Sequence, residues 1–267
     1  MSLILSNLAV DEFIHPLDKD AMNIVNKVPG FENLTKFIVE NSVEIVYNIQ
    51  LKGSTIRLTE NNAPRVYRLY KEAAEALGVS QLPELYLTRG YKFLNRIIGY
   101  SEPMILLHTN CIENLDDEQL KFILGRCLSG IILKHNKLEF LCDIIDMLKV
   151  IPGVDVVASA LALPLNQWHR KSELSRDRGG LLACQNFEAA MQVMMLMSGV
   201  PYGDEKNIDI YDYIDQAVKF RETKGLEKAG RVAMTAFADK SWMIDRASEL
   251  FLWHDMGKYD EIIMNHE

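Results

Sequence analysis

The sequence predicts an α+β domain that is mostly α. Apolar residues recur at three- and four-residue spacing through most of the second half of the chain, which is typical of amphipathic helices. Short apolar or alternating runs bounded by turn residues, typical of strands, occur in the first half. No internal repeat or low-complexity linker divides the chain. We therefore expect a single domain over residues 1–267, with residues 1–60 as an N-terminal arm packed on it.

Local patterns place the individual elements. Strands are expected at residues 54–58, 84–88 and 104–108. Pro64 opens a helix that Gly78 closes. Asp116 and Gln119 have the spacing of a capping box and begin a central helix that runs past residue 131. Further helical patterns cover residues 31–45, 138–150, 158–184 with Pro164 as a kink near its start, 187–197, 210–220 and 241–253.

Charge and hydropathy exclude two classes of protein. The chain has 29 basic and 37 acidic residues and a net charge of -8, without a lysine or arginine cluster that would follow a phosphate backbone. We therefore expect no nucleic-acid partner. The longest apolar stretch, Val154–Trp168, contains Asp155 and Pro164 and is shorter than the about 20 residues that a membrane-spanning helix needs. We expect no membrane-spanning segment.

The cysteines and the N-terminus indicate a cellular location. Cys111, Cys127, Cys142 and Cys184 lie in largely apolar surroundings without paired CxxC spacing, which favours buried reduced thiols over disulfides. Residues 1–10 lack the basic and apolar regions of a signal peptide. A cytoplasmic location is therefore expected.

Two of the expected helices carry a resemblance to a known family. Leu115–Gly125, followed by Ile131 and His135, resembles the active-site helix of the zinc metallopeptidases of the HtpX and CAAX prenyl endopeptidase family. Trp168–Ala183 resembles the second signature of that family, with Glu173 at the position of the third zinc ligand. The similarity also includes Phe13–Pro16, Pro29–Phe31, Pro83–Tyr86, Arg246, Leu250 and Trp253, which is nearly the whole chain. It implies a zincin-like fold with a small sheet beside the active-site helix.

The catalytic motif of that family is degenerate in this sequence. In HExxH, two histidines four residues apart bind zinc from one helix face, and the glutamate is the base. The matching positions hold Arg126, Cys127 and Gly130, and Glu173 alone keeps a residue able to bind metal. Arginine offers no lone pair, and glycine has no side chain. The resemblance therefore implies a pseudopeptidase without a zinc cofactor. We do not expect this chain to be an active enzyme.

Without zinc, Glu173 needs another partner. If the two helices meet as in the family, a buried unpaired carboxylate would be costly, and Arg126 can supply the missing cation. Asp177 would be a further partner. The alternative is that Arg126 points to solvent.

Ordinary structural roles compete with functional ones at several positions. Cys127 could act as a replacement nucleophile, but it falls on the apolar stripe of its helix and is expected in the core. His135 is expected on the opposite helix face from Arg126, as a surface or structural histidine. Met194, Met195 and Met197 have the spacing of core residues rather than of an adaptable binding surface.

Two further sites follow from the resemblance and from spacing. The strand Met104, Ile105, Leu106, Leu107 and His108 matches the sheet edge along which substrate lies in the family, so a peptide or protein partner is possible. His169, Glu173 and Asp177 lie one helical turn apart and form either a solvated face or a makeshift metal site. The latter would give a zinc metalloendopeptidase with non-standard ligands. A purely structural or oligomer-forming role is the third hypothesis.

Overall fold

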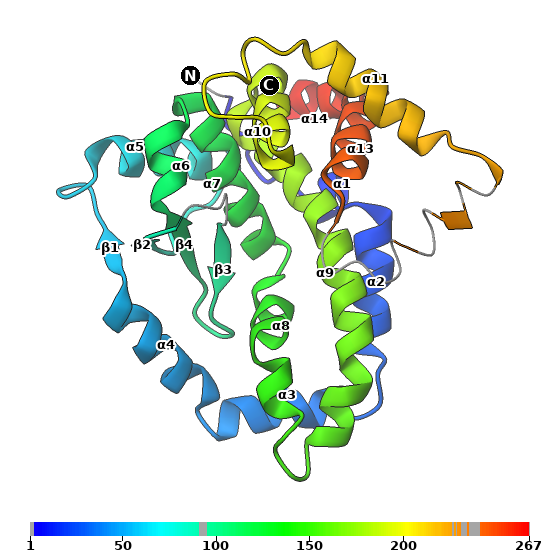
Figure 1. Ribbon diagram of the computed structural model, residues 1–267. Helices are drawn as coiled ribbons and strands as arrows, with labels where there is room; N and C mark the ends of the chain where they lie inside the picture. Colours follow the sequence, from blue (N-terminus) through cyan, green and yellow to red (C-terminus); the bar gives the residue numbers. More distant parts are fainter. Residues whose placement is uncertain are drawn as a thin grey trace.

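The computed structural model describes residues 3–90, 95–225, 227, 229–230, 234 and 241–266. It is mostly helical with one small sheet, which confirms the α+β class (Figure 1). The helices are α1 (Val10–Phe13), α2 (Pro16–Asn26), α3 (Phe31–Glu40), α4 (Val43–Ser54), α5 (Pro64–Ala76), α6 (Thr109–Asn114), α7 (Asp117–Ile132), α8 (Asn136–Leu148), α9 (Asp155–Cys184), α10 (Phe187–Ser198), α11 (Ile210–Arg221), α13 (Met243–Asp255) and α14 (Lys258–His266). The strands are β1 (Ile56–Leu58), β2 (Glu84–Thr88), β3 (Arg96–Ile98) and β4 (Met104–His108).

The sheet has the order β1-β2-β4-β3, with β2 and β4 parallel and the other pairs antiparallel. Met104–His108, which we expected at the sheet edge, is therefore an interior strand, and that expectation is wrong. β3 pairs with it from Ile98 opposite Met104 to Arg96 opposite Leu106. Arg96-Ile97-Ile98 lacks the apolar–polar alternation that predicts a strand at residues 54–58, so the sequence does not indicate β3 or the true edge.

Both faces of the sheet are covered by helices. Side chains alternate between the two faces of each strand, as the period of two requires. One face joins the large core beside α5 and α7, and the other face packs against Tyr47 and Leu51 of α4. The first set includes Leu85, Ile97, Ile105 and Leu107, and the second is Tyr86, Ile98, Met104 and Leu106. The central helix α7 thus lies directly beneath the sheet, with α9 on its other side (Figure 1).

Small residues bring α7 and α9 unusually close together. A Cβ added to Gly125 of α7 would lie 2.3 Å from the Cβ of Ala183, and one added to Gly179 of α9 would lie 2.1 Å from the Cβ of Ser129. The start of α7 is fixed by the expected capping box, in which the side chain of Asp116 accepts from the backbone N–H of Gln119. Polar side chains on the facing surfaces of these helices are therefore held within direct contact distance.

A buried aspartate on α2 connects the N-terminal helices to α9 and to the residue that precedes α8. Asp18 of α2 is 0% exposed and accepts hydrogen bonds from Nε1 of Trp168 at 3.0 Å and Oγ of Ser175 at 2.5 Å. Nε2 of His135 lies 3.1 Å from the same carboxylate. We expected His135 on the far face of the central helix, but α7 ends before it and Lys134 adopts a φ of 59°. That turn directs His135 into the interior, where it has a structural role.

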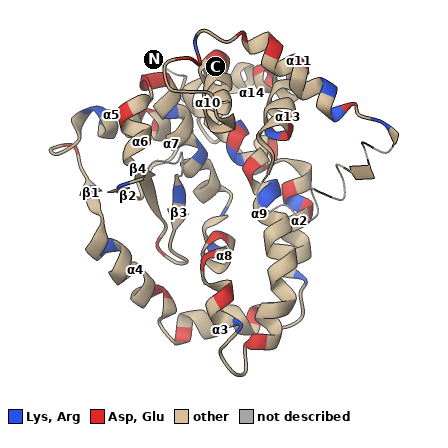
Figure 2. Ribbon diagram, viewed as in Figure 1, with Lys and Arg blue, Asp and Glu red and all other residues tan. Residues whose placement is uncertain are grey.

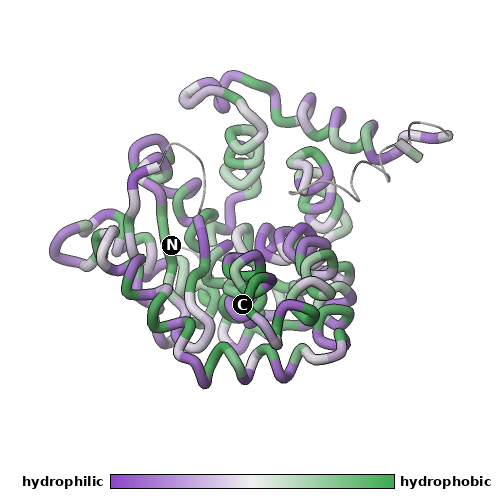
Figure 3. The backbone as a smooth tube through the Cα atoms, turned by 60° about the horizontal axis from the view of Figure 1, so that its bottom comes forward, coloured by the Kyte–Doolittle hydropathy of each residue, from purple (hydrophilic) through white to green (hydrophobic). Residues whose placement is uncertain are grey.

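In the part of the chain that the structure describes, no helix is both long enough and apolar enough to cross a bilayer. Hydrophobic and hydrophilic residues alternate along the helices (Figure 3). All four cysteines are free thiols, and three of them are buried. Cys142 is the partly exposed one.

Candidate functional site

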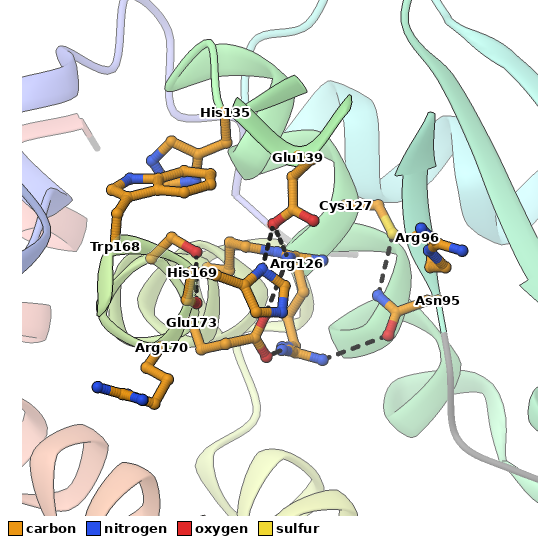
Figure 4. Close-up of polar contacts among 12 residues, drawn as sticks. Asn95, Arg96, Arg126, Cys127, His135, Glu139, Trp168, His169, Arg170 and Glu173 are labelled. Carbon is orange, nitrogen blue, oxygen red and sulfur yellow. Dashed lines mark hydrogen bonds and ion pairs between the residues drawn. The ribbon is translucent and has the colours of Figure 1, made fainter. Parts of the chain in front are cut away.

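Arg126 lies on the face of α7 that meets α9, and its side chain is 1% exposed. Its Nε donates to Oδ1 of Asp177 at 2.7 Å, and its Nη1 donates to Oδ1 of Asn95 at 3.3 Å. Its Nη2 forms an ion pair with Glu173 (Figure 4). The pairing expected from the sequence is therefore present, with Asp177 as a further partner, and the alternative of a solvent-facing Arg126 is wrong.

A second arginine binds the same two carboxylates from a different helix. Arg246 of α13 donates through Nε to Oδ2 of Asp177 at 2.8 Å and through Nη2 to Oδ1 at 2.6 Å. This is the two-pronged arrangement in which arginine binds carboxylate most strongly. Its Nη1 also lies 3.0 Å from Oε2 of Glu173. Arg246 is part of the family resemblance, but the sequence analysis assigned it no role. Its partners are about 70 residues away in the chain, so sequence spacing does not reveal the contact.

A third arginine extends the cluster toward α8. Nη1 of Arg176 donates to Oε1 of Glu173 at 2.8 Å and to Oε1 of Glu139 at 3.0 Å. Nδ1 of His169 lies 3.3 Å from the same oxygen of Glu139 (Figure 4). We call Arg126, Arg176, Arg246, Glu139, Glu173 and Asp177 the charge network. Its three cations balance its three anions, and they gather where α9 passes α7, α8 and α13 (Figure 2).

The network sets the ionisation of its acids. Burial alone would raise the pKa of Glu173, but Arg176, Arg126 and Arg246 hold that pKa well below its usual range. Burial also acts against ionised Glu139, yet His169 and Arg176 bring its pKa down to about 2. The pKa of His169 is raised in turn by the charge of Glu139. At neutral pH these acids are carboxylates engaged with cations, so neither Glu139 nor Glu173 is poised to accept a proton.

The residues at the family's metal-ligand positions do not fit a catalytic zinc. The guanidinium of Arg126 has no free lone pair, and Gly130 contributes no donor. A Cβ on Gly130 would lie 2.4 Å from Cδ1 of Ile97 and 3.5 Å from Cδ of Arg176, so other side chains fill the space a second imidazole would need. Both oxygens of Glu173 face arginines. Among the described residues, no three side chains of His, Cys, Asp or Glu are grouped so that they could hold a metal ion.

The other candidate groups have structural roles. Cys127 is 0% exposed, and its Sγ accepts from Nδ2 of Asn95 at 3.0 Å. Burial raises the pKa of this thiol, so it is a core cysteine rather than a nucleophile. Met194 and Met195 are fully buried, as expected of core methionines, whereas Met197 is partly buried and packs against the core.

The His169, Glu173 and Asp177 stripe is not a solvated face. Asp177 is 1% exposed and the side chain of Glu173 is 15% exposed. His169 turns toward α8, while the two carboxylates turn toward α7 and α13. The solvated-face expectation is therefore wrong for the two carboxylates, whereas the side chain of His169 is 34% exposed. The three residues do lie on one helix at one-turn spacing, but spacing alone does not show which neighbouring helices cover a polar stripe.

Asn95, like Arg176 and Glu139, is a site residue that the sequence did not indicate. It directly precedes β3 and joins Arg126 to Cys127 through its side-chain amide (Figure 4). The strand beside the candidate site is thus β3, not Met104–His108. A single asparagine before a three-residue strand carries no recognisable signal, and only the fold reveals its contacts.

The helix pair, the glutamate on α9 and the adjoining strand agree with the metallopeptidase class that the resemblance implies. A comparison with known proteins agrees with that class. The chain is 25% identical over 269 residues to the plastoglobule-localized metallopeptidase 48, chloroplastic, of Arabidopsis thaliana. The aligned region covers 98% of this chain and 77% of that protein. This similarity supports a metallopeptidase family. No family model matches the chain, and no solved structure matches it.

Proposed function

We propose that this chain is a catalytically degenerate metallopeptidase-family protein, a pseudopeptidase that works as a peptide- or protein-binding or regulatory module. One observation carries the proposal. The guanidinium of Arg126 lies between Glu173 and Asp177, where the family would hold its metal. A permanent cation there satisfies the buried carboxylates and leaves no group to activate water.

The proposed fold is zincin-like. Supporting it are a small mixed sheet packed on the central helix α7 and a second helix, α9, that directs Glu173 at the first. If a partner adds a strand to this sheet, it can do so at β3 or β1, the two edge strands of the described part. β3 is the edge nearer the charge network, because Asn95 precedes it.

We keep a cytoplasmic location as a proposal, supported by the four free thiols. The chloroplast plastoglobule is the location named for the similar Arabidopsis protein. Fractionation of cells that express the chain with a C-terminal epitope tag separates these locations. Recovery in the cytosolic fraction is expected, and recovery with an organelle or lipid fraction would contradict the proposal.

A zinc metalloendopeptidase with non-standard ligands is the alternative function. The name of the similar Arabidopsis protein and the retained Glu173 favour it. It would require the network to open, because His169, Glu173 and Asp177 now face different partners. Opening would separate buried opposite charges, which is expensive in free energy.

Metal content and proteolysis together test the proposal. The protein is purified without chelator, incubated with zinc, dialysed, and analysed for metal by mass spectrometry. Well under one zinc per chain and no cleavage of casein are expected. The control is the Glu173→Gln variant, which removes the one competent family ligand while keeping its shape. Stoichiometric zinc that survives dialysis and is lost in this variant would show that the alternative holds.

A further inference from the structure

A pocket on the side of α9 away from the sheet is not part of the candidate site. It has a volume of about 490 Å³ and lies among α1, the start of α2, α9, α13 and α14. In Figure 1, α1, α13 and α14 lie beside the C-terminal part of α9. Its apolar wall includes Ile14, Leu252, Trp253, Met256 and Ile262. Its volume lies within the roughly 300–1,000 Å³ of small-molecule sites, and charged residues from α1, α9, α11, α13 and α14 line most of the rest of the wall.

Arg178 is the polar anchor of this pocket. Its guanidinium lies 5.1 Å from the centre of the Trp253 ring, which is cation–π distance. Nη1 donates only to the backbone carbonyls of Phe13 and Ile14, at 3.4 and 3.3 Å. Nε and Nη2 donate to none of the residues that the structure describes. Both are therefore available to a ligand.

Arg178 is also the one cation on the pocket wall that lacks an ion-pair partner among the described residues. Burial lowers the pKa of Arg178 to about 10, although the charge of Glu249 acts to raise it. Glu249 lies beyond ion-pair distance of Arg178 and pairs with Arg221 instead. Arg178 remains a cation at neutral pH. The other two cations on the wall are paired, Arg221 with Glu249 at 2.5 Å and Lys258 with Glu261 at 2.8 Å. Of the remaining acids, Asp11 pairs with Lys19 at 2.7 Å, and Glu12 lies 3.2 Å from Nε2 of His266.

We propose that this pocket binds a small organic acid, with its carboxylate on Arg178 and its apolar chain against Trp253 and Leu252. A carboxylate can accept two parallel N–H bonds from a guanidinium, which is stronger and more directional than a contact with a neutral group. The apolar wall then selects an acid with a hydrocarbon body over a small inorganic anion. This inference does not depend on the proposed function, because the pocket shares no residue with the charge network.

Titration calorimetry of the whole chain tests the carboxylate requirement. Octanoate and N-acetyl-leucyl-leucine present a carboxylate on a fatty chain and on a peptide end, and each is compared with its own primary amide. We expect at least one acid to bind at least about tenfold more tightly than its amide, the effect of a charge-assisted pair. The acid that binds more tightly identifies the source of the ligand. If neither acid is preferred over its amide, the proposal is wrong.

Matched variants locate the binding. Arg178→Gln removes the free charge, whereas Lys258→Gln removes a cation on the same wall that is already paired with Glu261. Arg178→Gln should weaken binding of the preferred acid at least about tenfold, and Lys258→Gln by less than about threefold. Equal effects would overturn the assignment. Circular dichroism checks the fold of each variant, and if Arg178→Gln does not fold, the comparison of acid with amide in the natural chain decides alone.

Discussion

Arg126 of α7 and Asp177 of α9 are joined by an ion pair of 2.7 Å in which each side chain is 1% exposed. Neither charge can recover its hydration without local opening of the helix pair. In such a site the removal of one partner leaves the other buried and uncompensated, which costs far more than the loss of an exposed pair. The charge network therefore couples its members energetically.

Arg126→Ala should lower the free energy of unfolding by about 3 kcal/mol, because it strands charge on Glu173 and Asp177. Glu173→Ala should also destabilise, but the double variant should cost less than the sum of the two. Urea unfolding of the four proteins measures this cycle. Arg68→Ala is the control, since Arg68 is 53% exposed and its pairs should contribute at most about 1 kcal/mol. Additive losses would contradict coupling.

Two glycine substitutions should have opposite effects. In Gly179→Ala the new methyl group would lie 2.1 Å from Cβ of Ser129, forcing α7 and α9 apart at a cost of about 2 kcal/mol. In Gly53→Ala nothing lies within 4 Å of the added Cβ, so the gain in helix propensity should stabilise by up to about 1 kcal/mol. Melting temperatures of the two variants check the sign. A neutral Gly179→Ala would mean that the helices are not in close contact.

Acid should destabilise the protein through Glu139. Its folded pKa of about 2 lies below the ordinary 4.5, so its contribution is complete above about pH 4.5 and is lost as pH falls toward 2. Between pH 6 and pH 3 that loss is about 2 kcal/mol. Glu139→Gln should therefore show a smaller drop in unfolding free energy than the natural chain between those pH values. Glu60→Gln, at an exposed carboxylate paired with Lys71, should show the natural drop.

Restoring the family's ligands should require more than two histidines. Arg126→His with Gly130→His supplies the i and i+4 pair, but Ile97 and Arg176 fill the space beside Gly130. We expect this double variant to take up no zinc. Adding Ile97→Ala and Arg176→Ala removes the obstruction and one cation beside Glu173, and zinc should then bind in a titration. A double variant that binds zinc as well as the quadruple variant does would contradict this account of the packing.

The sequence predicted the large elements because their patterns are local. The bounds of α5, α7, β2 and β4 lie within a few residues of those expected, since proline, a capping box and apolar runs mark their ends. Residues 31–45 form two helices rather than one, because Ser42 adopts a φ of 52° between α3 and α4. Helical periodicity continues across that break, so it could not reveal the turn.

The residues of the candidate site could be predicted only where the resemblance indicated which distant parts of the chain lie close together in space. The sequence predicts that Arg126 pairs with Glu173 and Asp177 because the resemblance implies that their two helices meet. The contributions of Arg246, Arg176 and Asn95 depend on which side chains point into one small volume, and no spacing along the chain encodes that. The edge strand was misplaced for the same reason, since pairing order in a sheet is a long-range property.

The carboxylate of Asp18 has a further consequence, for the time course of synthesis. Trp168 and Ser175 are 150 and 157 residues away from it in the chain. At a translation rate of about 5–20 residues per second, roughly 8 to 30 s pass between the synthesis of α2 and that of its partners. During that interval the apolar side of α2 has no helix α9 to cover it. A nascent chain stalled before residue 168 should therefore expose α2 to chaperones and proteases, and α2 should become protected once α9 has been made.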